Sequence, residues 1–228
     1  MVIDLNETNP KGWNEDKKPK LDNTTDAVIY EMHIRDFTID ESSGVSDSLK
    51  GTYLGAVQEN TIYKDIYSEK TVKTGLDHLV ELGITHVHLM PVFDFGSVDE
   101  RFPSSNNRNW GYDPKNFNAP EGSYSTNPYN PVTRIIELRE MIMKFHAKGI
   151  RVVMDMVYNH MMGTMNMDNI VPGYYFRTDS LGRFTNGSGC GNELATERVM
   201  VRKFIEESII YWAKEYHIDG FRFDLMGL

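Results

Sequence analysis

Four short runs of apolar residues, each bounded by turn-forming residues, recur along the chain. They cover residues 28–37, 84–93, 150–158 and 218–225. Apolar runs of this length with Gly, Asn, Pro or Asp at their ends predict buried β-strands.

Three segments between these runs repeat apolar residues every three or four positions, as amphipathic helices do. They are residues 71–82, 131–149 and 197–216. Gly83 and Gly149 stand where glycine commonly ends a helix. The alternation of strand and helix predicts an α/β fold with a parallel sheet and right-handed crossovers.

Two long segments rich in Gly, Asn, Pro and Tyr interrupt this alternation. Residues 95–131 follow the second predicted strand, and residues 161–195 follow the third. Loops of this length are usually functional, and ligands of α/β folds bind at the carboxyl ends of the strands. Residues 1–26 have almost no apolar period, so we expect an N-terminal arm or linker before a domain of residues 27–228.

The composition narrows the classes of function. The 228 residues are 40% hydrophobic with a net charge of -9, which is typical of a globular protein and disfavours nucleic acid or a membrane as partner. The one cysteine, Cys190, forms no internal disulfide and no thiol-based zinc site. The first residues lack the pattern of a signal peptide, so we expect a cytoplasmic protein, without excluding an extracellular parent.

Polar side chains gather where the predicted strands end. Residues 31–36, 155–160 and 219–224 each combine acidic residues with His, Asn or Arg. Strand alternation places Arg222 and Asp224 on one face. A lone Arg-x-Asp is more often a structural ion pair, but three polar strand ends at one edge favour a functional site.

The first insertion contains the run Asn109-Trp110-Gly111-Tyr112-Asp113-Pro114. Its aromatic rings suit a platform for the apolar face of a sugar, with Asp113 binding hydroxyl groups. The alternative is a loop with a small core of its own, made by Trp110, Tyr112 and Phe117.

Three of these runs, in this order, carry a family resemblance. Residues 109–114 (NWGYDP), 155–160 (DMVYNH) and 220–227 (GFRFDLMG) together resemble the α-amylase superfamily of glycoside hydrolases, and most of all its type I pullulanases, which debranch α-1,6-linked glucans. The likeness extends over nearly the whole chain. One position departs from the pattern, since Arg108 stands where these enzymes usually have Tyr.

The resemblance implies a fold and a set of roles. The fold is half of a (β/α)8 TIM barrel, with four parallel strands, their helices and a B-domain-like insertion after the third strand over residues 161–195. Asp224 matches the catalytic nucleophile and Arg222 its cationic partner. Asp155 matches the carboxylate that braces the arginine, while Tyr112 and His160 match a stacking ring and a hydroxyl-binding histidine.

Asn159 matches a calcium ligand of many amylases, although a loop-capping role is as good an interpretation. The resemblance requires no cofactor, and it leaves open whether calcium is bound. Trp110 and Asp113 are the further candidate substrate-binding residues.

The implied reaction is hydrolysis or transfer of α-1,4 or α-1,6 glucosyl linkages by a retaining mechanism, on α-glucans or maltooligosaccharides. That mechanism needs two carboxyl groups, and the family carries its acid/base Glu on the fifth strand. We therefore expect a homodimer or a complementing second half-barrel, with Glu193 or Asp113 as less favoured local proton donors. The alternative is an inactive or glucan-binding fragment of a longer pullulanase.

Overall fold

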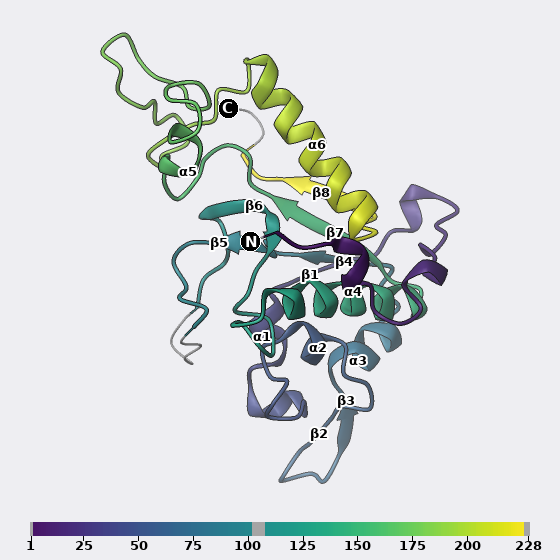
Figure 1. The fold of residues 1–228 in the computed structure, drawn as a ribbon. Coiled ribbons are helices and arrows are strands. Elements are labelled where there is room, and N and C mark those ends of the chain that lie inside the picture. Colours follow the sequence, from purple (N-terminus) through teal and green to yellow (C-terminus); the bar gives the residue numbers. More distant parts are fainter. Residues whose placement is uncertain (1, 102–107, 226–228) are drawn as a thin grey trace.

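Four parallel strands form the central sheet of the computed structural model, which describes residues 2–101 and 108–225. The strands are β1 (Ile29–Met32), β4 (His86–Leu89), β7 (Arg151–Met156) and β8 (Gly220–Phe223), side by side in that order (Figure 1). Each neighbouring pair is parallel. The predicted α/β fold is confirmed, as the first four strands of a TIM barrel.

Three helices link these strands and cover one side of the sheet. They are α3 (Gly75–Glu81), α4 (Pro131–Ala147) and α6 (Val199–Glu215). The helix α4 begins where the Asn130 side chain accepts a hydrogen bond from the Val132 amide, with Pro131 in the first turn. Its side chains Leu138, Ile142 and Phe145 are fully buried, as the apolar period predicts. Among the described residues, no helix has both the length and the apolar character needed to cross a membrane.

Shorter elements fill the connections. They are the 3-10 turns Leu5–Thr8, Trp13–Glu15, Thr24–Asp26 and Glu41–Ser43, the short helices α1 (Ile34–Thr38), α2 (Tyr53–Ala56) and α5 (Met165–Asp168), and the strands β2 (Ile62–Lys64), β3 (Thr71–Lys73), β5 (Phe93–Phe95) and β6 (Pro114–Pro120). The β2–β3 hairpin projects away from the body, and β5 pairs with β6 as a separate ribbon (Figure 1).

Three predicted boundaries were wrong. The first strand ends at Met32, because the His33 imidazole caps a helix by accepting from the Asp36 amide. The second stops at Leu89, and the chain resumes as β5 after Pro91, which has no N–H to donate to a strand ladder. Residues 71–73, predicted as the start of a helix, form β3 of the hairpin.

The predicted N-terminal arm lies against the helical layer. The Trp13 ring stacks on His217 with 4.0 Å between centroids, and the Arg139 guanidinium lies 5.3 Å from the Trp13 ring centre. Arg139 Nη1 also donates to the Leu5 carbonyl and the Thr8 hydroxyl. The arm is therefore a packed part of the structure, and the boundary after residue 26 stays a prediction.

A buried imidazole joins the arm to the last strand. His146 of α4 lies 2.9 Å from Asp16 through Nδ1 and 2.9 Å from Asp219 through Nε2. Burial lowers the pKa of His146, but the hydrogen bonds and charges of Asp219 and Asp16 outweigh it and raise the pKa overall. We call these three residues the histidine clamp.

The clamp predicts a pH dependence of stability. Because the folded state raises the pKa of His146, its contribution is complete below the unfolded pKa and is lost as pH rises through the folded pKa. We expect the free energy of unfolding in urea to fall more between pH 6 and pH 8 for the wild type than for His146→Gln. The exposed His78→Gln variant should behave as the wild type does, and equal slopes for all three proteins would contradict the clamp.

Candidate active site

A buried carboxylate at the end of β7 is the centre of the polar site. Asp155 is fully buried, and the β7–β8 register pairs it with Arg222. Arg222 Nη1 lies 3.0 Å from Asp155 Oδ2 and 2.8 Å from Asp224 Oδ1. The predicted shared face of Arg222 and Asp224 is confirmed, and one guanidinium serves two carboxylates.

The charges of this group reinforce one another. Burial lowers the pKa of Arg222, while Asp155 and Asp224 raise it overall, so the guanidinium stays charged. Its hydrogen bond to Asp224 Oδ1 fixes the direction of that carboxylate. The side chain of Asp224 is 18% exposed, so an incoming group has access to it.

Tyr112 joins the first insertion to this centre. Its hydroxyl donates to Asp155 Oδ2 at 2.8 Å. Burial first, and then the hydrogen bond to Asp155, raise the pKa of the phenol, so the hydroxyl keeps its proton. The structure thus brings together four of the predicted site residues, namely Asp155, Tyr112, Arg222 and Asp224.

His160 contacts the same insertion at the backbone of Tyr112. Its Nε2 lies 2.8 Å from the Tyr112 carbonyl, and its Nδ1 lies 2.8 Å from Asn159 Nδ2. A carbonyl only accepts, so Nε2 carries the proton and Nδ1 accepts from the Asn159 amide. Burial lowers the pKa of His160, which keeps this neutral form. Both ring nitrogens are engaged within the protein, and the predicted contact with a substrate hydroxyl stays a prediction.

Asp113 organises the turn that presents Tyr112. Its carboxylate accepts from the Ser97 amide at 2.8 Å and from Asn109 Nδ2 at 2.7 Å. Gly111 has a φ of 88°, and a Cβ there would lie 2.8 Å from the Pro91 Cβ. The turn therefore requires glycine at this position.

Trp110 lies apart from the buried centre. It is 56% exposed, with the Arg108 guanidinium 5.8 Å from its ring centre. The alternative of a loop core containing Trp110 is wrong, because the ring faces solvent. Together these two residues and the turn line a cavity of about 470 Å³, with Tyr112 and Asp113 among its walls.

One polar residue of the sheet, His88, escaped the sequence analysis. His88 of β4 has one ring nitrogen 3.5 Å from Glu31 of β1 and the other 3.5 Å from Asp155. Glu31 pairs with His88 in the register, so carboxylate, imidazole, carboxylate and guanidinium follow one another across the four strands. The available signal was a polar residue at alternate positions in apolar runs.

The sequence analysis also named Glu193 as a local proton donor and Asn159 as a calcium ligand. Glu193 is bonded to Arg177 and Thr185 inside the second insertion, and the Thr185 hydroxyl first lowers its pKa, which disfavours a proton donor. Asn159 Oδ1 is buried without a hydrogen-bond partner there, as one calcium ligand would be. However, no three His, Cys, Asp or Glu side chains of the described chain gather as a metal site, whereas calcium takes about six to eight oxygen ligands. Calcium also takes backbone carbonyls, amide oxygens and water, so the role of Asn159 as a ligand stays a prediction.

Comparisons with known proteins extend the resemblance. Residues 69–170 match the family model described as alpha amylase, catalytic domain. The pullulanase of Bacillus subtilis (strain 168) is 47% identical over 95% of this chain and 29% of its own length. Isoamylase 3, chloroplastic, of Oryza sativa subsp. japonica is 36% identical over 97% of this chain and 28% of its own length.

Solved structures that resemble this chain are also pullulanases. The crystal structure of a pullulanase from Paenibacillus barengoltzii in complex with maltohexaose and alpha-cyclodextrin has a TM-score of 0.94 and 51% identity, covering 100% of this chain and 35% of that one. The pullulanase from Bacillus acidopullulyticus has a TM-score of 0.91 and 51% identity, covering 99% of this chain and 27% of that one. The chain thus spans about a third of such proteins.

The bond between Tyr112 and Asp155 gives a measurable prediction. Tyr112→Phe removes a donor to a buried carboxylate, and hydrogen bonds to charged groups contribute about 1.5–3 kcal/mol. We expect the free energy of unfolding in urea to fall by that amount. Tyr63→Phe in the β2–β3 hairpin, where the ring is 39% exposed, is the control and should change it little. Equal losses in the two variants would contradict the role of the bond.

Proposed function

Because the chain belongs to the α-amylase family, we propose that it acts on α-glucans as a pullulanase-type glycoside hydrolase or α-glucanotransferase. The observation that carries the proposal is the group of Asp155, Arg222 and Asp224 within the motifs of that family. A solved relative is a pullulanase in complex with maltohexaose, which supports an α-glucan as ligand here.

In this proposal Asp224 is the nucleophile of a retaining reaction. Its carboxylate forms a bond to the anomeric carbon while the glycosidic C–O bond breaks, and the leaving oxygen takes a proton from a second carboxyl group. Water, or a hydroxyl group of another sugar, then releases the glycosyl unit, giving hydrolysis or transfer. Arg222 orients the Asp224 carboxylate, and the ring of Tyr112 supports the sugar at the point of cleavage.

The distance required between the two carboxyl groups limits which residue can be the proton donor. Retaining enzymes hold their two carboxyl groups about 5–5.5 Å apart. Asp155 is bonded to both Arg222 and Tyr112, and Asp113 is committed to its turn. We therefore assign the donor to a second half-barrel that completes the site.

The exposed edges of the sheet support such a partner. Ile29 of the edge strand β1 is 61% exposed, and Phe223 of the edge strand β8 is 36% exposed. Two copies related by a twofold axis along the barrel would pair β8 of each with β1 of the other and close eight parallel strands. A homodimer is therefore the arrangement we propose.

A second function remains the alternative, that of a glucan-binding or inactive piece of a longer pullulanase. The coverage of 29% of the Bacillus subtilis relative favours it. The two functions differ in what they do to a maltooligosaccharide, since only the first changes its length.

The nucleophile is tested by incubating the chain with maltohexaose and with pullulan and separating the products. Shorter products alone mean hydrolysis, and longer and shorter products together mean transfer. Asp224→Asn should abolish either pattern, and Asp26→Asn, in the arm, should retain it. Turnover that survives in Asp224→Asn would overturn the assignment, and no product from the wild type would favour the alternative function.

The dimer is tested by sedimentation velocity at low micromolar concentration. We expect the wild type to sediment as a dimer and Ile29→Lys, which places a charge at the edge of β1, to sediment as a monomer. Lys64→Ala, on the projecting hairpin, should leave the dimer intact. A folded monomer of the wild type would refute this arrangement.

A further inference from the structure

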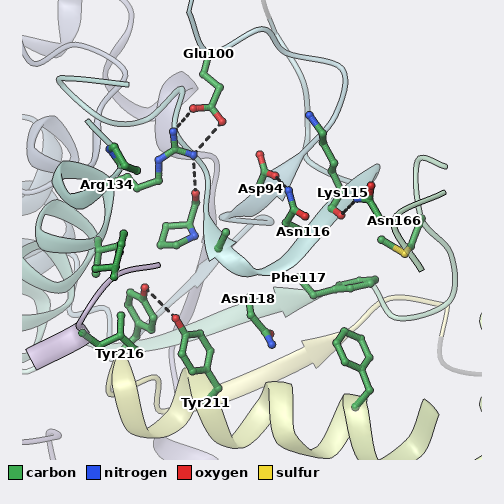
Figure 2. A pocket seen from close by; sticks show the side chains of 18 of the residues that line it. Asp94, Glu100, Lys115, Asn116, Phe117, Asn118, Arg134, Asn166, Tyr211 and Tyr216 are labelled. Carbon is green, nitrogen blue, oxygen red and sulfur yellow. Dashed lines mark hydrogen bonds and ion pairs between the residues drawn. The ribbon is translucent and has the colours of Figure 1, made fainter. Parts of the chain in front are cut away.

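A second and larger cavity lies away from the candidate active site. It has a volume of about 850 Å³, within the range of about 300–1,000 Å³ that is usual for ligand pockets. Its walls come from β6, α4 and α6, with Ile3 of the arm and Met167 of the second insertion also contributing (Figure 2). None of the residues around Asp155 that form the candidate active site lines it.

The charges of this cavity cancel. Arg134 donates two hydrogen bonds to the Glu100 carboxylate, with 2.9 Å between Nη1 and Oε1 (Figure 2). Asp94 accepts a hydrogen bond from Asn116, and Lys115 supplies the second cation. Two acidic and two basic side chains leave no net charge, so the cavity favours a neutral ligand over an anion or a cation.

One wall carries amides suited to hydroxyl groups. Asn116 and Asn118 alternate on β6, and Asn166 stands on α5. One end of each amide is bonded within the protein, to Asp94, Ser208 and the Lys115 carbonyl respectively. The other ends, Asn116 Oδ1, Asn118 Nδ2 and Asn166 Oδ1, have no partner within the described residues. Two acceptors and one donor therefore remain for a ligand that both donates and accepts.

The other wall is apolar and aromatic. Phe204 and Tyr211 of α6 are half-buried, and Ile170 is 74% exposed. A hexose ring matches such a pair of walls, because it has a face of C–H groups and a rim of hydroxyls. A charged cofactor or a purely apolar ligand would match only one of them.

We propose that this cavity is an accessory α-glucan site, separate from the candidate active site and taking a short maltooligosaccharide. The choice of an α-glucan among neutral sugars rests on the proposed function. The cavity would hold a second part of a branched chain, or a second chain.

Methionine methyl groups report on the cavity directly. Met161 and Met167 line it, whereas Met200 on α6 does not. We expect maltohexaose at millimolar concentration to shift the ¹³C-methyl resonance of Met167 in a saturable way, and to leave that of Met200 unchanged. The same shift is expected in Tyr112→Ala, which weakens the candidate active site only.

A matched pair of variants tests the location. Asn166→Trp adds bulk to the cavity wall at an exposed position and should abolish the Met167 shift. Asn169→Trp adds the same bulk at an exposed position outside the cavity and should keep the shift. An unchanged Met154 resonance, from the buried part of β7, verifies that both variants remain folded.

The possible results separate this inference from the proposed function. Absence of a saturable Met167 shift, its survival in Asn166→Trp, its loss in Tyr112→Ala, or an equal response to sorbitol would each overturn the accessory site. A saturable shift confined to maltohexaose, together with turnover that survives in Asp224→Asn, would support the accessory site and overturn only the nucleophile.

Discussion

The buried carboxylate of Asp155 is the group on which the rest of the site depends. A charge with no exposed surface is costly unless it is paired and hydrogen-bonded. Its partners come from three separate parts of the chain, with Arg222 on β8, Tyr112 on the first insertion and His88 on β4. The need to satisfy one carboxylate therefore fixes the register of the last strand and the position of the insertion together.

The sequence predicted this site better than it predicted the local boundaries. Arg222 and Asp224 were placed on one face because strand alternation is a simple geometric rule, and parallel topology placed the end of the strand with Asp155 at the same edge. The contact of Asp155 with the arginine was implied by the family resemblance. The split of the second strand and the cap at His33 depend on single side chains, whose effect is decided by their tertiary surroundings. His88 was missed because a lone polar residue in an apolar run has no partner until the register is known.

The β5–β6 ribbon connects the two proposed ligand sites. Trp212 of α6 donates its indole N–H to the Phe117 carbonyl of β6 at 3.0 Å, and Tyr158 donates to Ser208 at 2.7 Å. Ser208 in turn donates to Asn118 in the wall of the large cavity. A continuous set of hydrogen bonds thus runs from that wall to Tyr158, which immediately precedes Asn159 and His160 at the end of β7. The same ribbon leads back from Pro114 to the turn that carries Tyr112.

The histidine clamp has a consequence for the order of folding. His217, beside the clamp, contacts Asp16 across 201 residues of sequence, and His146 bridges the two ends of that interval. Contacts between such distant positions carry a large loop-closure entropy and form late. The arm is also held by Arg139 of α4, but its contacts through Asp16 are complete only once Asp219 and His217 are in place. The clamp thus ties the first and the last segments of the chain together, so that a change at Asp219 beside β8 reaches the arm through one imidazole.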